Sequence, residues 1–331
     1  MTDSNVTVAV VGAGNWGKNH VRVLANMPGV RLKMVCDVSP ERIRLVNDSF
    51  PEVETVSDHR RVLDDPDVRA VVVASSVATH YDLARDFINS GRDVLVEKPM
   101  ALDSRSADDL VNVAEAAGRV LMVGHILVFH PAVGYLKKLV EGRELGDIFY
   151  IYSQRVNLGV IRRDENAMWS LGPHDISVIN YLLDSMPVDI SASGASYLQA
   201  GIEDIVFLNM RYPGGQMAHS QLSWLDPYKV RRMILVGSRK MVVFEDTEPT
   251  EKIKIYDKGA ENTDYRSYGE SLALRFGDIY IPRILMKEPL TLELEHFIES
   301  VRSGDRPITD GASGLAVVRI LEEAQAFLGG A

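Results

Sequence analysis

Lys98 stands where an apolar segment stops abruptly on charge. Residues 94–96 have the β-branched, apolar composition of a buried strand, and Glu97-Lys98-Pro99 follows them directly. Ligands bind at the carboxyl ends of parallel strands, and a lysine held there can stabilise an alkoxide that develops on a substrate. Pro99 restricts Lys98 to extended backbone geometry. The same residues also suit a surface Lys–Glu pair, so they leave both interpretations open by themselves.

A glycine pattern suited to phosphate binding lies near the N-terminus. Gly12, Gly14 and Gly17 form G-x-G-x-x-G, directly after the apolar residues 8–11 and before a segment of helical spacing. The first glycine permits a tight turn, the second lets a pyrophosphate approach the backbone, and the third lets helix and strand pack closely. Free N–H groups at the helix start then bind the phosphates. The loop predicted to hold a dinucleotide consists of Gly12, Gly14, Asn15, Trp16 and Gly17.

An acid follows this loop at the spacing expected for a ribose contact. Asp37 lies at the end of the next predicted strand, where a carboxylate meets the adenosine ribose hydroxyls. This carboxylate would repel a 2′-phosphate, so the sequence predicts NAD rather than NADP. Arg42 and Arg44 nearby leave the NADP alternative open, and Asp37 could also be a turn residue at a strand end.

Such motifs require a parallel sheet, and the first 124 residues have the pattern of one. Short apolar runs alternate there with segments of helical spacing, one of which is capped by Asp103 and followed by Gly118. Continuous apolar strands indicate a parallel sheet with helices on both faces. The expected strands are residues 6–11, 31–36, 70–74, 93–96 and 120–123.

Beyond Gly124 the pattern changes to long alternating stretches, which are typical of antiparallel strands with one buried face. The sequence therefore predicts an α/β protein with a domain for the dinucleotide at 1–124 and a domain for substrate binding and oligomerisation at 125–331. Expected strands are 148–157, 188–196, 205–212, 216–224 and 233–244, and expected helices are 131–141, 172–183, 292–302 and 314–328.

Composition excludes several classes of protein. The net charge of −10 argues against nucleic acid as a general partner, because phosphate binding needs a basic face. A single cysteine, Cys36, excludes an internal disulfide and fits a reducing cytoplasm. No run of about 18 apolar residues is present, and the N-terminus lacks a signal-peptide pattern, so no membrane span is expected. The sequence contains no cluster of His, Cys and Asp at ligand spacing, so no metal site is predicted.

Five segments together resemble one known family, the Gfo/Idh/MocA oxidoreductases, the group of glucose–fructose oxidoreductase and inositol dehydrogenase. They read GAGNWG, Asp37, ASSVATHYDLA around His80, EKPMAL and LGPHDISVINYLL, and the resemblance covers nearly the whole chain. It implies an N-terminal Rossmann domain with a doubly wound parallel sheet. It also implies a C-terminal α/β domain with a large, mostly antiparallel sheet, whose outer face commonly forms subunit contacts.

The resemblance also implies roles for particular residues. Lys98 matches the family's lysine that touches both cofactor and substrate, and Ser75, His80 and Glu97 fall among its cofactor-binding positions. His174 matches the usual acid/base position, and a histidine can accept the proton of a secondary alcohol near neutral pH. The alternative for His174 is a packing residue at a helix N-terminus.

The chain departs from the family pattern before this histidine. Residues 170–174 read SLGPH where relatives that act on sugars or inositol often carry D-x-G-x-H, so Ser170 puts a cyclitol substrate in doubt. Arginine side chains nearby suggest an anionic substrate such as a nucleotide diphosphate, although a solvated loop explains them equally well. The candidate substrate-binding residues are Lys98, Arg155, Asn157, Arg162, Arg163 and His174.

The resulting expectation is an NAD-dependent dehydrogenase, a homodimer or homotetramer, that oxidises a secondary hydroxyl of a nucleotide-linked sugar. The resemblance suggests C3 of a UDP-N-acetylhexosamine. Alternatives are an inositol or free-sugar dehydrogenase, redox-assisted glycoside cleavage, and a non-catalytic NAD(H)-binding regulator. The presence of both Lys98 and His174 argues against the regulator, which would need no acid/base pair.

Overall fold

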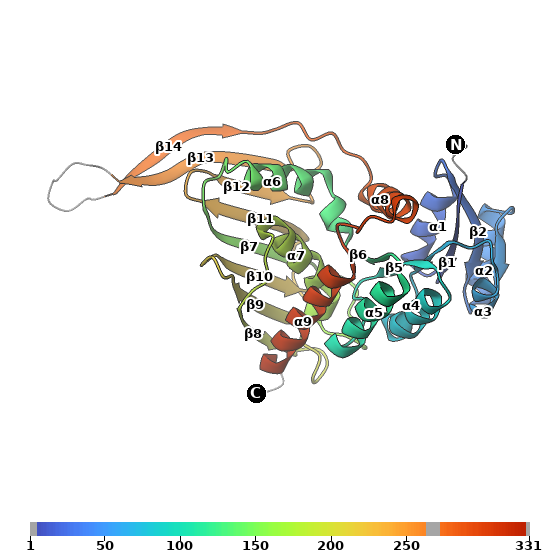
Figure 1. The fold of residues 1–331 in the computed structure, drawn as a ribbon. Coiled ribbons are helices and arrows are strands. Elements are labelled where there is room, and N and C mark those ends of the chain that lie inside the picture. The colour runs from blue at the N-terminus through green and yellow to red at the C-terminus, as the bar shows by residue number, and fades with distance from the viewer. Residues whose placement is uncertain (1–4, 263–271, 329–331) are drawn as a thin grey trace. The chain divides into compact units, whose positions relative to one another are not determined.

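The computed structural model describes residues 5–262 and 272–328, and the chain forms two compact units (Figure 1). The first unit is Met1–Phe129 with Glu288–Arg319, and the second is His130–Lys287 with Ile320–Ala331. The sequence predicted a single boundary at residue 124. The structure differs because a later segment of the chain returns to the first unit.

The first unit contains a six-stranded parallel sheet in the order β3-β2-β1-β4-β5-β6, which is the order of dinucleotide-binding folds. This confirms the predicted parallel sheet. Its strands are β1 (Val6–Val11), β2 (Val30–Cys36), β3 (Glu54–Val56), β4 (Ala70–Val73), β5 (Asp93–Glu97) and β6 (Leu121–Gly124). The helical connections are α1 (Gly17–Ala25), α2 (Pro40–Ser49), α3 (Arg60–Leu63), η1 (Val77–Thr79), α4 (His80–Asn89) and α5 (Ser104–Ala117).

Local sequence explains several of these elements. Every residue of β4, β5 and β6 is buried, as expected for strands covered on both faces. Helix α5 begins after Asp103, whose carboxylate accepts a hydrogen bond from the Ser106 amide at 2.7 Å. It ends at Gly118, which has a left-handed conformation with φ of 59°. Both ends of α5 agree with the sequence prediction.

The returning segment includes α8 (Pro289–Ser303), which packs against α1 and η2 (Ile126–Phe129). Its apolar side chains recur at helical spacing and join the core cluster that contains Val8, Val10 and Leu24. This burial holds α8 in the first unit, although it follows the second sheet in the sequence. The buried apolar residues of α8 are Leu290, Leu294, Phe297, Ile298 and Val301.

The second unit contains an eight-stranded sheet in the order β14-β13-β12-β11-β7-β10-β9-β8. All neighbouring strands are antiparallel except β7 and β10, so the predicted, mostly antiparallel sheet is confirmed. The strands are β7 (Ile148–Val156), β8 (Asp189–Ala195), β9 (Ile205–Arg211), β10 (Met217–Ser223), β11 (Val230–Gly237), β12 (Met241–Glu245), β13 (Ile253–Asn262) and β14 (Leu272–Tyr280).

Strands β13 and β14 were not predicted from the sequence, and the single strand expected at 233–244 is two antiparallel strands, β11 and β12. Only residues 253–256 of β13 pair with β12, and the rest of β13 pairs with β14 alone. The two strands therefore extend beyond the neighbouring strands, as Figure 1 shows. Their sequences mix charges such as Lys254, Asp257 and Lys258 with apolar residues, because little of this ribbon packs against a core. The alternation that marks the central strands is correspondingly weak.

Helix α7 (Ala167–Leu183) packs against β7, β9 and β10, and α6 (Pro131–Glu141) packs against α7. Helix α7 begins five residues earlier than predicted, at an N-cap where the Asn166 side chain accepts from the Trp169 amide at 3.0 Å. Gly172 and Pro173 break the helical pattern in the sequence, but the helix continues through them. The last helix is α9 (Gly311–Leu328).

The face of this sheet opposite α7 carries apolar and aromatic side chains. Arg155 and Ser153 of β7 are buried on the α7 side, so Tyr150 and Tyr152 lie on the opposite face, where their rings stack at 6.5 Å. Met217 on the neighbouring strand β10 pairs with Tyr150 and is 53% exposed in the single chain. The helix that packs against β7 is α7, on the other face of the sheet.

Candidate dinucleotide and catalytic site

The glycine loop after β1 has the geometry of a dinucleotide site. Gly12 has φ of 97°, and a Cβ on it would lie 2.6 Å from backbone atoms of Ala74 and Ser75. A Cβ on Gly17 would lie 1.9 Å from the Gly12 carbonyl oxygen. Both positions therefore require glycine. At Gly14, by contrast, the nearest atoms to a Cβ belong to the flexible Arg42 side chain, so the backbone there is open to approach by a ligand.

The start of α1 suits an anion. Trp16 is the N-cap residue, and no side chain of the described chain caps the helix. The first turn contains no acidic residue. The free N–H groups and the positive end of the helix dipole are therefore available to a pyrophosphate. This arrangement fits NAD, and the residues that would hold its phosphates are those of the loop from Gly12 to Gly17.

Asp37 lies at the end of β2 beside this loop. It is 5% exposed and accepts hydrogen bonds from the Ala13 amide at 2.7 Å and the Ser39 amide at 2.8 Å. These bonds fix the carboxylate in the place where the ribose contact is predicted. The Arg42 guanidinium lies 3.5 Å from the same carboxylate, and this side chain is half exposed. Asp37 thereby offsets the positive charge that would favour a 2′-phosphate.

Lys98 follows β5, and its peptide bond to Pro99 is cis. His80, at the start of α4, is buried beneath this turn. Its Nδ1 lies 2.9 Å from the Pro99 carbonyl oxygen, and its Nε2 lies 3.1 Å from the Ser75 carbonyl oxygen. Burial lowers the pKa of His80 despite these two carbonyls. His80 therefore connects the segments that follow β4 and β5, because it contacts the carbonyl oxygens of both Ser75 and Pro99.

The carboxylate of Glu97 points into the interior of the first unit. Its Oε1 accepts from the indole Nε1 of Trp16 at 2.6 Å and lies 2.8 Å from Nε2 of His20. Its Oε2 accepts from the Lys98 backbone amide at 3.2 Å. Burial raises the pKa of Glu97, but the hydrogen bond and charge of His20, with the charge of Lys98, outweigh burial and hold the pKa below its ordinary value. Glu97 is therefore an ionised group in the site.

A second carboxyl, Glu293 of α8, is buried near Glu97. It is fully buried, and neither of its oxygens has a hydrogen-bond partner among residues 5–262 and 272–328. Burial, followed by the negative charge of Glu97, raises the pKa of Glu293 well above its ordinary value. One acid of this pair therefore carries the charge and the other carries a proton. Glu293 was missed in the sequence, although it lies within the apolar stripe of α8.

His20 was also missed. It lies on α1, three residues after the last glycine of the loop, and is fully buried. A histidine on the buried side of this helix needs a polar partner. Only the fold shows that the partner comes from the end of a strand 77 residues later in the sequence.

In the second unit, His174 lies on α7 and is half-buried. The next residue, Asp175, is 3% exposed and pairs with Arg155 of β7. The Arg155 Nε lies 3.2 Å from both carboxylate oxygens, and its Nη2 lies 2.8 Å from Oδ1. The sequence offered Arg155 as a donor to substrate phosphate. The structure instead engages two of its nitrogens with Asp175, so Arg155 holds α7 to the sheet beside His174.

The remaining substrate candidates lie on the segment between β7 and α7. The Arg162 and Arg163 side chains are exposed, and Arg162 Nε pairs with Glu165 at 3.2 Å. Asn157 continues the hydrogen bonding between β7 and β10, because its backbone amide donates to the Ser223 carbonyl at 3.1 Å. Ser170 lies on α7. Arg162 and Arg163 thus remain accessible to an anion, whereas Arg155 is buried.

The N-terminal turn of α7 is anchored by polar residues that the sequence did not reveal. The Asn166 Nδ2 donates to Glu203 at 2.6 Å and to Gln325 at 2.8 Å, and the Trp169 indole donates to the same Gln325 oxygen at 3.1 Å. The N-cap preference of asparagine was the one available signal for Asn166. Its partners come from distant segments, which only the fold brings together.

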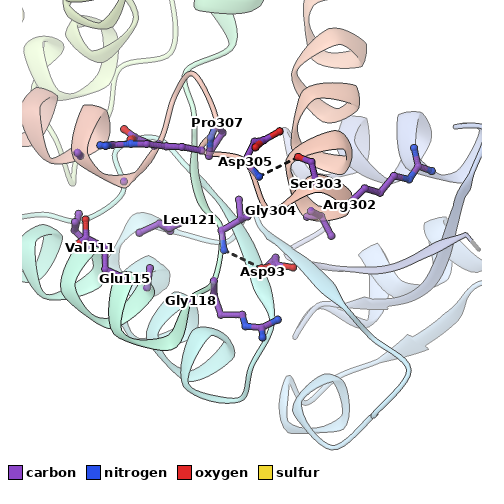
Figure 2. A pocket seen from close by; sticks show the side chains of 18 of the residues that line it. Asp93, Val111, Glu115, Gly118, Leu121, Arg302, Ser303, Gly304, Asp305 and Pro307 are labelled. Carbon is purple, nitrogen blue, oxygen red and sulfur yellow. Dashed lines mark hydrogen bonds and ion pairs between the residues drawn. The ribbon is translucent and has the colours of Figure 1, made fainter.

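A pocket of about 540 Å³ lies at the opposite edge of the first sheet, near the starts of β5 and β6 (Figure 2). Asp93 on its wall accepts from the Val120 amide at 2.9 Å and lies 4.0 Å from Arg69. Arg306 pairs with Asp310 on another wall. Arginines and acids therefore neutralise one another, and the walls favour neither sign of ligand charge. Because parallel strands end at the other edge, this pocket is separate from the site of Lys98.

Neither a metal site nor a membrane-spanning helix is present among the described residues. No group of three or more His, Cys, Asp or Glu side chains there could hold a metal ion. Among the helices described, none has the length and apolar character needed to cross a bilayer.

The chain belongs to the Gfo/Idh/MocA oxidoreductase family. Residues 6–125 match the family's NAD-binding Rossmann fold, and residues 133–243 match its C-terminal domain. The protein is therefore an oxidoreductase of this family with NAD as its cofactor.

Three similar proteins illustrate this membership. A provisionally named oxidoreductase from Magnetospirillum magnetotacticum MS-1 is 30% identical with a TM-score of 0.83, over 97% of this chain and 100% of that one. The UDP-N-acetylglucosamine 3-dehydrogenase of Acidithiobacillus ferrooxidans is 23% identical with a TM-score of 0.81, over 97% of each chain. The myo-inositol 2-dehydrogenase of Thermotoga maritima is 23% identical over 93% of this chain and 91% of its own length.

The buried pair Glu97–Glu293 gives a prediction about stability. The pKa of Glu293 is raised in the folded protein, so its contribution is complete below its unfolded pKa and is lost as the pH rises through its folded pKa. Glu293→Gln removes this loss because glutamine stays neutral. We expect the variant to gain stability over the wild type as the pH rises from 5 to 8, by up to about 1.4 kcal/mol per pH unit. Urea unfolding midpoints across this range measure the gain.

The matched control is Glu299→Gln, which changes an exposed glutamate of the same helix. Its unfolding midpoint should follow that of the wild type at every pH. Parallel curves for Glu293→Gln and the wild type would show that Glu293 is not held protonated by its surroundings.

Proposed function

We propose that the protein is an NAD-dependent dehydrogenase that oxidises a secondary hydroxyl, at C3, of a nucleotide-linked sugar such as a UDP-N-acetylhexosamine. The observation that carries the proposal is the placement of Lys98 at the carboxyl edge of the first sheet, in the same unit as the glycine loop. A lysine anchored there by Glu97 and His80 suits substrate chemistry, whereas a solvated surface lysine would need no such buried support.

In this proposal Lys98 holds the reacting hydroxyl and stabilises its developing negative charge. His174 accepts the hydroxyl proton as the carbonyl forms, since a histidine exchanges protons near neutral pH. NAD, when bound, supplies the acceptor for the hydride that leaves the same carbon. The buried Arg155–Asp175 pair fixes the helix that carries His174. Each residue thus has one task, and the atoms of the alcohol are accounted for.

The exposed arginines support the proposal that the substrate carries a nucleotide. Arg162 and Arg163 present forked donors that suit phosphate geometry, and remote binding of this kind positions a sugar without taking part in the reaction. A structural neighbour acts as a UDP-N-acetylglucosamine 3-dehydrogenase. The alternative, an inositol or free-sugar dehydrogenase, is supported by the inositol dehydrogenase among the relatives, and Ser170 in place of aspartate weighs against it.

Removing either proposed catalytic group should abolish most of the activity. Lys98→Ala and His174→Ala should each lower turnover by roughly 10²-fold or more, the usual scale for electrostatic and acid/base groups. NADH binding, followed by fluorescence, should change little for His174→Ala. His59→Ala, which removes a partly exposed histidine of the first unit, is the control. Near-normal turnover of His174→Ala would remove His174 from the mechanism, and a wild type that binds NADH but turns over no candidate would favour a regulator.

A panel of UDP-sugars, free sugars and inositols, assayed for NADH formation, tests the substrate class. A coupled aminotransferase should be included to remove an unfavourable keto product. We expect the fastest turnover with a UDP-N-acetylhexosamine or its uronic acid, and a rise in KM of at least about tenfold for an Arg162→Ala/Arg163→Ala double variant.

Arg211→Ala is the control. Arg211 is exposed and lies next to Met217 and the start of β7, whereas Arg162 and Arg163 follow the end of β7. Faster turnover of myo-inositol or free glucose than of any nucleotide sugar would overturn the substrate proposal. An unchanged KM in the double variant would overturn only the proposal that the two arginines bind phosphate, and would leave the rest of the substrate proposal standing.

We also propose that two or four copies of the chain assemble through the open face of the second sheet, around Tyr150, Tyr152 and Met217. Light scattering should then give a mass that is a multiple of 36.7 kDa. Tyr152→Asp should shift the mass toward the monomer, because a charge would be buried at the interface. Val38→Asp, at an 85% exposed position of the first unit, should not. A concentration-independent mass of 36.7 kDa for the wild type would contradict the assembly.

A further inference from the structure

The Glu97 carboxylate occupies a space that the neighbouring strand leaves for it. Glu97 is the last residue of β5 and pairs with Gly124, the last residue of β6. A Cβ on Gly124 would lie 3.0 Å from the carboxyl carbon and from both oxygens of Glu97. The absence of a side chain at Gly124 therefore lets the acid fold back beside the strand, and Glu97 is only 8% exposed as a result.

The two oxygens of this carboxylate face different parts of the site. Oε1 receives the Trp16 indole N–H from the dinucleotide loop, with His20 of α1 beside it. Oε2 receives the backbone N–H of Lys98. A carboxylate is planar and rigid, so its two oxygens move together. A shift of Trp16 is therefore passed to the amide of Lys98 through one group.

The groups around Glu97 favour its charged form. His20 faces it from α1, His80 from α4, Lys98 from its own strand end, His125 from the residue after β6, and Glu293 from α8. Three N–H groups converge on its oxygens, and a protonated carboxyl could not accept all of them equally. Burial of the charge makes each of these bonds stronger than it would be in water.

Trp16 is the part of this network that a dinucleotide can reach. It stands at one of the variable positions of the glycine loop, at the N-cap of α1, where the phosphates are expected. It is 42% exposed even though its N–H is bonded to a buried acid. Its ring thus has one edge in the site and one edge on Glu97.

We propose that Glu97 is a positioning residue that couples occupancy of the dinucleotide loop, through Trp16, to the placement of Lys98. The coupling extends the proposed role of Lys98, but it rests on NAD binding by the first unit and does not depend on the substrate. The coupling also explains why an acid precedes this lysine. The Glu97 carboxylate binds the backbone amide of Lys98 and, at the same time, the Trp16 indole of the glycine loop.

Hydrogen exchange measured by mass spectrometry, with and without saturating NADH, tests this coupling. In the wild type, NADH should slow exchange in the segment 97–102 as well as in the loop 12–18. Trp16→Phe keeps an aromatic ring and removes the N–H donor. With NADH raised until each protein is saturated, we expect this variant to lose at least about half of the NADH-induced protection in 97–102, because one charge-assisted hydrogen bond carries the effect.

The chain offers a matched control in its second unit. The Trp224 indole donates to the buried carboxylate of Asp204 at 2.6 Å, the same distance as between Trp16 and Glu97. Trp224→Phe breaks an equivalent bond and should leave the NADH-induced protection of 97–102 unchanged. A general loss of stability would alter both variants, whereas the proposed coupling alters only Trp16→Phe.

A second variant approaches the carboxylate from the other side. Gly124→Ala places a methyl group against Glu97 without touching Trp16, and should change exchange in 12–18 and in 97–102 together. Unchanged protection of 97–102 in Trp16→Phe, or a response of only one segment in Gly124→Ala, would overturn the coupling. Failure of the wild type to bind NADH would instead contradict NAD binding itself, so the two failures are distinguishable.

Discussion

The buried negative charge of Glu97 is the interaction on which the arrangement of the dinucleotide site depends. An uncompensated carboxylate in a protein interior is costly, so the charge is tolerated only where several donors converge on it. Here the donors come from the glycine loop, from α1 and from the backbone of Lys98. The glycine loop, helix α1 and the strand end that carries Lys98 are therefore held by the same anion.

This constraint also explains the protonation of Glu293. Two buried carboxyls close to each other cannot both be ionised without large cost, and only Glu97 has hydrogen-bond donors among the described residues. Helix α8 thus brings a neutral acid, and not a second charge, to the back of the site. The second unit uses a related device, because Asp175 beside His174 is buried against the guanidinium of Arg155. In both units a buried carboxylate fixes the backbone next to a proposed catalytic side chain.

Sequence patterns predicted the elements whose signals are local. The glycine loop, the limits of α5 and the strand that ends on Glu97 depend on neighbouring residues, and the structure agrees with them. The return of α8 to the first unit depends on burial in one core cluster of residues nearly 300 positions apart, such as Val8 and Leu294, and no local pattern encodes it. The early start of α7 was obscured by Gly172 and Pro173, which usually end helices but here lie within one. The same limit applies to the site. Motifs pointed to Lys98, His174 and the glycines as candidates, whereas His20, Glu293 and the Asp175 partner of Arg155 became visible only when the fold brought distant residues together.

Infrared difference spectroscopy of the wild type and Glu293→Gln, at neutral pH, tests most directly whether one anion anchors the site. The account predicts that the wild type shows the C=O stretching band of a buried, protonated carboxyl and that this band disappears in the variant. Loss of a carboxylate band in its place would show that Glu293 is ionised. The charge would then not be confined to Glu97, and the account of the site would be contradicted.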